Sequence, residues 1–326
     1  MAEMEMIDPL GRIVDYLRIS VTDRCNERCL YCMPSDFHDW IPRDNVLTRE
    51  EFRAIMKTGA DLGVKRLRIT GGEPTARRDI VEIVADAAAT PGIQHVSMTT
   101  NGTRLSKLAR PLFAAGLRSL NVSLDALEPA RYQAITAGKL APVLEGLAAA
   151  KEAGFEKIKL NTVLIRGRNE DQINALIDFA EENEMLIRFI ELMPVSLTEM
   201  LSEENFLPAA EVQRKLGELI PIERSYGAGP AKYFRLAGRR AIVGFIGALT
   251  DLHFCERCNK MRVTCDGKLR PCLGNHLEAD LIPALRPQID ERHLIRIFRQ
   301  TLAVKPAEHI FRDNYQPSRV MTAIGG

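Results

Sequence analysis

The stretch DYLRISVTDRCNERCLYC, residues 15–32, decides the fold and raises the first question about function. Its first six residues predict a β-strand, and Cys25, Cys29 and Cys32 follow in the loop behind that strand. The next cysteine in the chain is Cys255. A structural zinc ion takes four ligands, and His38 would complete such a set. A [4Fe–4S] cluster held by three thiolates would instead keep one iron open to a small molecule. The spacing alone allows both.

Strands and helices alternate outward from this stretch. The helix predicted at 47–63 has the residues of a capping box, Thr48 and Glu51, at its start and Gly63 at its end. Five further strands are predicted at 65–70, 93–100, 117–125, 157–165 and 185–194, with helical segments between them. Such alternation implies parallel strands joined by right-handed crossovers. We therefore expect an α/β fold, an incomplete (β/α)6 TIM-like barrel of parallel strands.

The alternation breaks after about residue 197. One more helix is predicted within 208–220, short strand-like pieces lie at 232–237 and 240–247, and a helical region follows the second cysteine group. We expect residues 1–220 to form the partial barrel and residues 221–326 to form a C-terminal region that covers its open side.

Composition excludes some classes of function. Lys plus Arg is 44 and Asp plus Glu is 43, and this balance argues against a broad nucleic-acid-binding surface. The longest apolar run, near 241–249, falls well short of the roughly 20 residues that span a bilayer. The first residues lack the apolar core of a secretory signal. We expect a cytoplasmic protein whose seven cysteines serve metal ligation or redox chemistry rather than disulfides.

Residues that carry chemistry are expected to gather at the carboxyl ends of the strands, where barrels of this kind place their active sites. The residues near the six predicted strand ends include Arg18, Arg68, Thr99, Ser123, Asp125, Lys159, Glu191 and Met193. Their convergence predicts an enzyme.

The second cysteine group lies in HFCERCNKMRVTCDGKLRPCLG, residues 253–274. It contains Cys255, Cys258, Cys265 and Cys272. Taken by spacing alone, two pairs of cysteines favour a zinc ribbon.

Two motifs indicate a different chemistry. The spacing of Cys25, Cys29 and Cys32 after a first strand, with GGEP (71–74) after the second, resembles the radical S-adenosylmethionine (SAM) superfamily. Within that superfamily, the CERCN segment (255–259), its basic neighbours and DGKLRPC (266–272) closely resemble the GTP 3′,8-cyclase family of molybdenum cofactor synthesis. The likeness runs from residue 15 to the terminal IGG.

The resemblance implies two [4Fe–4S] clusters, SAM as a cofactor and GTP as the substrate. The metal ligands would be Cys25, Cys29 and Cys32 for the first cluster and Cys255, Cys258 and Cys272 for the second. Cys265 would be a buried surplus thiol. Contacts with SAM would come from Tyr31, Gly72, Ser123 and Met193. Contacts with GTP would come from Arg18, Arg68, Thr99, Lys159, Lys260, Met261 and Arg262.

The triphosphate requires concentrated positive charge, to which Arg66 and Arg188 are expected to add. Position 260 holds lysine where the family usually has arginine, so this contact loses the planar guanidinium. By resemblance, the terminal Gly325 and Gly326 would reach into the active site and assist catalysis.

The implied reaction is abstraction of the ribose C3′ hydrogen of GTP by a 5′-deoxyadenosyl radical, followed by bonding of C3′ to guanine C8. The product would be (8S)-3′,8-cyclo-7,8-dihydroguanosine 5′-triphosphate. The enzyme would need an electron donor, would pass its product to the cyclic pyranopterin monophosphate synthase, and would be a monomer or homodimer. Two alternatives stay open: a radical SAM enzyme acting on a peptide, and a barrel with a zinc ribbon that binds nucleic acid or protein.

Overall fold

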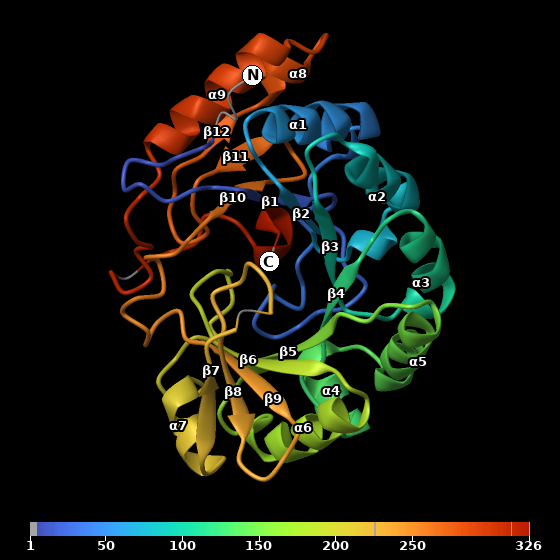
Figure 1. The fold of residues 1–326 in the computed structure, drawn as a ribbon, viewed down its shortest axis with the longest axis vertical. Helices are drawn as coiled ribbons and strands as arrows, with labels where there is room; N and C mark the ends of the chain where they lie inside the picture. Colours follow the sequence, from blue (N-terminus) through green and yellow to red (C-terminus); the bar gives the residue numbers. More distant parts are fainter. Residues whose placement is uncertain (1–4, 225, 314, 326) are drawn as a thin grey trace.

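The computed structural model describes residues 5–224, 226–313 and 315–325. Its first part alternates strands and helices as predicted (Figure 1). The strands are β1 (Tyr16–Ser20), β2 (Arg66–Thr70), β3 (His95–Thr100), β4 (Ser119–Ser123), β5 (Ile158–Leu164) and β6 (Leu186–Glu191). All five neighbouring pairs among them are parallel. The prediction of a partial barrel of six parallel strands is confirmed.

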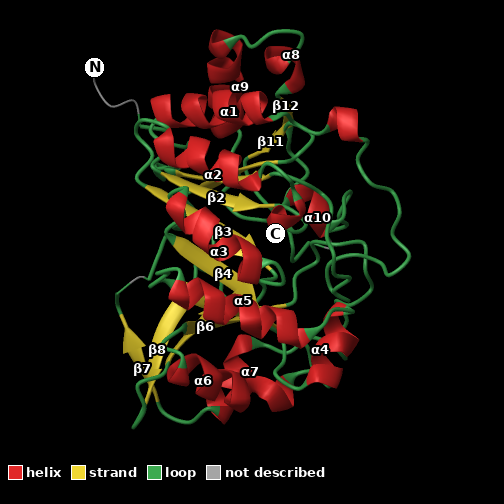
Figure 2. Cartoon of the chain, turned by 90° about the vertical axis from the view of Figure 1, so that its right-hand side faces the viewer, coloured by secondary structure: helices red, strands yellow, loops and turns green. Residues whose placement is uncertain are grey.

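Helices cover the outer face of these strands (Figure 2). They are α1 (Arg49–Asp61), α2 (Ile80–Ala89), α3 (Leu105–Ala114), α4 (Pro129–Thr136), α5 (Leu140–Glu152) and α6 (Ile173–Glu182), with short 3-10 turns η1 (Arg43–Asn45), η2 (Pro74–Ala76) and η3 (Glu170–Gln172). Helix α1 begins with the predicted capping box: Thr48 accepts from the Glu51 amide, and the Glu51 carboxylate accepts from the Thr48 amide. Gly63 follows the helix with φ of 100°.

The C-terminal part contributes α7 (Ala209–Lys215), β7 (Leu219–Ile222), β8 (Lys232–Leu236), β9 (Ile242–Ile246), β10 (Lys260–Val263), β11 (Lys268–Arg270), β12 (Ala279–Asp280), α8 (Ile282–Leu285), α9 (Glu291–Ala303) and α10 (Met321–Ile324). Helix α7 lies within the predicted range 208–220 and occupies only part of it. Helix α7 ends at Lys215 because Gly217 takes a left-handed φ of 80°, and the residues after it form β7.

The C-terminal strands extend the six-stranded sheet at both of its edges. The order is β12-β11-β10-β1-β2-β3-β4-β5-β6-β9-β8-β7, with β10 parallel to β1 and β9 parallel to β6. The sheet curves, and α10 lies within its arc (Figure 1). One sheet thus continues through both parts of the chain, and the division at residue 220 stays a prediction.

Alternation along the strands sends apolar and polar side chains to opposite faces. On β1, Leu17 and Ile19 are fully buried and belong to the main core, which also contains Phe52 and Ile55 of α1. The alternate residues of β1, such as Arg18 between Leu17 and Ile19, point to the inner face of the curved sheet. A TIM barrel normally fills its interior with branched apolar side chains. Here the inner face is polar, and it surrounds a cavity. Among the described residues, none of the helices is both long and apolar enough to cross a membrane.

Candidate active site

A cavity of about 990 Å³ occupies the interior of the partial barrel. Its wall includes all six of the cysteines predicted as cluster ligands, namely Cys25, Cys29, Cys32, Cys255, Cys258 and Cys272. The two cysteine groups, which are more than two hundred residues apart in the sequence, therefore border the same cavity. The remaining lining is rich in cations and hydrogen-bonding groups.

The GGEP loop lies directly against the segment that leads to the first cysteine. The amide of Gly72 donates to the carbonyl of Thr22 at 2.7 Å, and the amide of Glu73 donates to the carbonyl of Arg24 at 2.8 Å. A Cβ at position 72 would lie 2.4 Å from the carbonyl oxygen of Arg24. The approach of two backbones, beside a cavity lined by Gly71 and Gly72, explains why glycine is needed here.

Glu73 joins the loops after the first three strands. Its carboxylate accepts from the Thr75 amide at 3.0 Å, from Thr100 Oγ1 at 2.7 Å and from the Asn101 amide at 2.7 Å. Burial raises the pKa of this carboxyl, although the hydrogen bonds oppose the shift. Glu73 therefore fixes the turn by holding it to the end of β3.

The residues predicted to contact SAM line the wall beside the first cysteine group. Tyr31, Gly72, Ser123 and Met193 all border the cavity. The Tyr31 hydroxyl donates to Asp125 Oδ2 at 2.7 Å, and Asp125 Oδ1 accepts from the Val163 amide at 2.8 Å. Burial raises the pKa of Asp125 to about 6. These bonds fix the cysteine loop to the ends of β4 and β5.

Three arginines occupy adjacent positions on neighbouring strands. Arg18 on β1 is in register with Arg262 on β10 and with Arg68 on β2. Like charges opposite one another are unfavourable in a sheet. The repulsion among the three guanidinium groups costs free energy, and a polyanion between them would relieve it.

Two of these arginines lie deeper in the barrel than the strand ends at which they were expected. Arg18 and Arg68 lie in the middle of their strands, and not at the carboxyl ends. Because every second residue faces inward, they line the cavity from within the barrel. Arg188 of β6 joins them there and donates from Nε to Asn161 Oδ1 at 2.9 Å.

Burial and mutual repulsion weaken protonation in this cationic group. Burial, together with the neighbouring Arg262, holds the pKa of Arg18 well below its usual value. Burial and the charges of Arg188 and Arg68 lower the pKa of Lys159 to about 7. Burial alone would raise the pKa of Tyr16, but Arg68 and Arg18 outweigh it and bring that pKa to about 8. Neighbouring cations contribute to all three of these shifts, and the same positive charges would attract a negatively charged group.

Three predicted GTP contacts are not among the residues that line the cavity. Arg66 lies at the amino end of β2, is 40% exposed in its side chain and is paired with Asp15. Met261 faces the apolar core because its neighbours in β10, Lys260 and Arg262, face the cavity. Lys159 is buried on the inner face of β5, two residues before Asn161, which does line the cavity. Thr99 does border the cavity and accepts a hydrogen bond from Arg68 at 3.3 Å.

A lysine that the sequence did not single out lies at the second cysteine group. Lys305 is 5% exposed, and its Nζ donates to Pro271 O at 2.6 Å, to Lys260 O at 2.8 Å and to Cys258 Sγ at 3.6 Å. Burial opposes ionisation of Cys258, but Lys305 and Lys260 lower its pKa. The pKa values of Cys255 and Cys272 are raised, by burial first. Lys305 thus favours a thiolate at position 258.

Each predicted ligand set consists of three free thiols, a set that an iron–sulfur cluster can use. All seven cysteines are free, and Cys265 is fully buried and outside the cavity lining, as the surplus thiol was expected to be. His38 is exposed and does not border the cavity. In the described part of the chain, no three His, Cys, Asp or Glu side chains converge on a point that one metal ion would occupy. A [4Fe–4S] cluster spreads its sulfur ligands wider, because each thiolate binds a different iron.

The end of the chain reaches the same interior. Gly325 follows α10, and its carbonyl accepts from Arg262 Nη1 at 2.6 Å. A Cβ at Gly325 would lie 2.9 Å from side-chain carbons of Ser20 and Thr70 at the ends of β1 and β2. The terminal segment up to Gly325 therefore enters the barrel. Gly326 lies outside the described residues.

Comparison with known proteins identifies the chain. Residues 19–180 match the Radical SAM superfamily, and residues 185–311 match the family described as Molybdenum Cofactor Synthesis C. The chain is 42% identical to the GTP 3′,8-cyclase of Pelotomaculum thermopropionicum and to that of Moorella thermoacetica, in each case over 98% of this chain and 100% of the relative. It is also 42% identical to the GTP 3′,8-cyclase of Pseudomonas fluorescens over the whole of both chains. The chain belongs to the GTP 3′,8-cyclase family.

Solved structures confirm the fold of this GTP 3′,8-cyclase family member. SuiB of Streptococcus suis bound to the precursor peptide SuiA superposes with a TM-score of 0.62 and 16% identity, over 91% of this chain and 67% of that one. SuiB bound to S-adenosylmethionine gives a TM-score of 0.59 and 17% identity, over 82% of this chain and 64% of that one. At such identities the likeness concerns the radical SAM fold alone.

Sequence reasoning missed several residues that the family fold brings to the cavity. Tyr16 receives a hydrogen bond from Arg68 Nε, and Lys260 Nζ lies 5.6 Å from its ring centroid. Asn121 borders the cavity, and its side-chain oxygen has no hydrogen-bond partner among the described residues. Tyr16 and Asn121 could have been found by extending the alternation of β1 and β4 inward from the strand ends. No sequence signal marks Lys305.

Proposed function

We propose that this protein converts GTP to (8S)-3′,8-cyclo-7,8-dihydroguanosine 5′-triphosphate, the first step of molybdenum cofactor synthesis, and that it carries two [4Fe–4S] clusters. Membership of the GTP 3′,8-cyclase family supports the reaction. The observation that carries the proposal is one cavity bordered by two groups of three free thiols and by a row of arginines.

The two thiol groups would have different roles. Cys25, Cys29 and Cys32 would hold the first cluster next to the glycines of the GGEP loop, where Tyr31 and Ser123 would position SAM. Cys255, Cys258 and Cys272 would hold the second cluster and place guanine. The chemistry supplied there, when the clusters and SAM are bound, is one-electron reduction and abstraction of a hydrogen atom. The chain itself supplies orientation and a closed environment.

The cationic interior would hold the triphosphate. GTP carries about four negative charges, and guanidinium groups bind phosphate oxygens in pairs. Arg18, Arg68 and Arg262 lie side by side on three strands, and a triphosphate between them would replace repulsion by attraction. Lys260 adds charge without a planar fork, so its contact is less directional. Arg188 and the free side-chain oxygen of Asn121 would contact the nucleotide further along the wall.

Gly325 and Gly326 would complete the site from the C-terminal end. The bond from Arg262 to the Gly325 carbonyl supports this placement, because it ties the chain end to a predicted phosphate ligand. We further propose that an external donor supplies electrons and that the product passes to the cyclic pyranopterin monophosphate synthase.

Anaerobic reconstitution tests the proposal. Reconstituted protein incubated with SAM, dithionite and GTP should yield 5′-deoxyadenosine and the cyclised nucleotide in equal amounts. Formation of 5′-deoxyadenosine that does not depend on GTP, without cyclised nucleotide, would show that another molecule is the substrate.

Iron analysis tests the number of clusters. The protein should bind about eight irons with about eight acid-labile sulfides, since each cluster contains four irons. Replacing Cys25, Cys29 and Cys32 together by alanine should remove about half of both, and replacing Cys255, Cys258 and Cys272 should remove the other half. About two zinc atoms with no labile sulfide would support the zinc-ribbon alternative instead.

A further inference from the structure

The terminal segment contacts both cysteine-bearing parts of the protein. Val320 and Ala323 are buried against Met33, in a small apolar cluster that also includes Cys25 of the first cysteine loop. Gly325 fits between Ser20 and Thr70. The few apolar contacts of one short helix give little stability by themselves. Polar contacts outside α10 therefore matter for holding the terminal segment in place.

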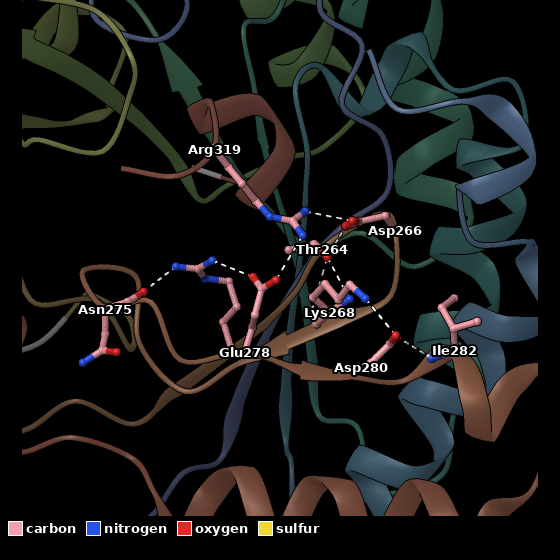
Figure 3. Close-up of polar contacts among 9 residues, drawn as sticks. Thr264, Asp266, Lys268, Asn275, Glu278, Asp280, Ile282 and Arg319 are labelled. Carbon is pink, nitrogen blue, oxygen red and sulfur yellow. Dashed lines mark hydrogen bonds and ion pairs between the residues drawn. The ribbon is translucent and has the colours of Figure 1, made fainter. Parts of the chain in front are cut away.

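Arg319, just before α10, makes such an anchor with the region that carries the second cysteine group (Figure 3). Its Nη1 donates to Asp266 Oδ2 at 2.8 Å, and its Nη2 donates to Glu278 Oε1 at 3.1 Å. The side chains are only 23%, 16% and 27% exposed, respectively. Two charge-assisted bonds that are partly shielded from water are stronger than ordinary surface ion pairs.

Both carboxylates are already oriented by other groups of the same region. Asp266 Oδ1 accepts from Thr264 Oγ1 at 2.5 Å, within the turn between β10 and β11 (Figure 3). Glu278 Oε2 accepts from Arg270 Nη1 at 2.9 Å, and the Arg270 side chain is 1% exposed. Oriented acceptors reduce the entropy lost when Arg319 binds. Asp266 lies in the turn between β10, which carries Arg262, and β11, which is followed closely by Cys272, and Glu278 immediately precedes β12.

We propose that Arg319 is a positioning residue that anchors the terminal segment in the cavity. The anchor places Gly325 between the ends of β1 and β2, where its carbonyl reaches Arg262 on β10. The catalytic consequence rests on the proposed function of the terminal glycines. Arg319 and Gly325 fix the two ends of α10, one on the β10–β11 turn and the other on the inner face of β10. The anchor thus couples the geometry of the second cysteine region to the closure of the site.

Hydrogen exchange of the reconstituted full-length protein tests the anchor directly. Arg319→Ala should speed exchange of the amides of residues 320–325 about tenfold or more, as expected for loss of two charge-assisted bonds. The kcat for GTP cyclisation should fall by a similar factor, whereas KM should change less than about threefold because the phosphate-binding arginines are retained. Arg319→Lys, which keeps the charge but loses the fork, should lie between these values.

Two further variants separate positioning from general stability. The swap Asp266→Arg with Arg319→Asp should restore slow exchange and much of the kcat. It rebuilds an ion pair between positions 266 and 319 and keeps the existing ion pair between Arg270 and Glu278. Arg239→Ala is the matched control: Arg239 also pairs with two carboxylates, Asp178 and Glu181 of α6, at the opposite end of the sheet from the β10–β11 turn. It should lower thermal stability without changing exchange of residues 320–325.

The outcomes are distinguishable. Wild-type exchange of residues 320–325 in Arg319→Ala, or equally fast exchange in Arg239→Ala, would overturn the anchor. Faster exchange with an unchanged kcat would support the anchor and overturn the proposed catalytic role of the terminal glycines.

Discussion

Replacement of Gly325 by alanine should release the terminal segment from the cavity. Gly325 has a φ of 73°, where a residue with a side chain is disfavoured by about 1–2 kcal/mol. The added Cβ would also lie 2.9 Å from both Ser20 and Thr70, and overpacking of this kind typically costs about 1–3 kcal/mol. Together these effects amount to about 2–5 kcal/mol, a shift of roughly thirtyfold or more in the docking equilibrium.

Limited proteolysis measures this shift. Trypsin cleaves after Arg319, and cleavage there requires the segment to leave the site, because Val320 is only 4% exposed. When opening is fast relative to cleavage, the cleavage rate follows the open population. Mass spectrometry of the released C-terminal peptide should therefore show cleavage about thirtyfold faster, or more, in Gly325→Ala. GTP turnover should fall with it.

Gly238→Ala is a matched control. Gly238 has the same φ of 73°, in the turn between β8 and β9, but a Cβ there would meet nothing within 4 Å. It should cost about 1–2 kcal/mol in chemical denaturation and leave cleavage after Arg319 unchanged. A Gly325→Ala protein cleaved within about threefold of the wild-type rate would refute the placement of Gly325 between β1 and β2.

The remaining predictions concern the two cysteine groups and the cationic interior. Lys305→Met should lower the reduction potential of the proposed second cluster, measured by electron paramagnetic resonance titration, because a cation and a hydrogen bond to Cys258 are lost. Lys305→Arg should retain most of that potential, and an unchanged potential in Lys305→Met would contradict this reasoning. Gly72→Ala should remove about half of the bound iron, since a Cβ 2.4 Å from Arg24 O displaces the first cysteine loop, and full iron content would argue against that reason. Lys159 has a pKa of about 7 without ligand, against a usual 10.5, so it should take up a proton when GTP binds. The affinity for GTP, measured by calorimetry, should therefore fall as pH rises above 7. This pH dependence should flatten in Lys159→Met. Without ligand the unfolded chain binds more protons at Lys159 between pH 7 and 10.5, so stability toward urea should rise across that window, and a fall would contradict the assignment.

The sequence by itself determined the six parallel strands, the start of α1 and the two groups of thiols. Each of these rests on local pattern: alternation and spacing within a strand, a cap within one helical turn, or cysteines within one loop. The superfamily likewise follows from the spacing of the first three cysteines and the GGEP loop, and the family follows from the CERCN and DGKLRPC segments, because all these motifs are short and contiguous.

Tertiary structure decided which polar residues share the cavity. Arg66 and Arg68 are equivalent by sequence pattern, yet only Arg68 borders the cavity, since depth along the barrel axis depends on how all the strands are staggered. Lys305 reaches Cys258 across 47 residues, and Arg319 reaches Asp266 across 53. Such contacts form only when distant segments pack, so no local pattern in the chain encodes them.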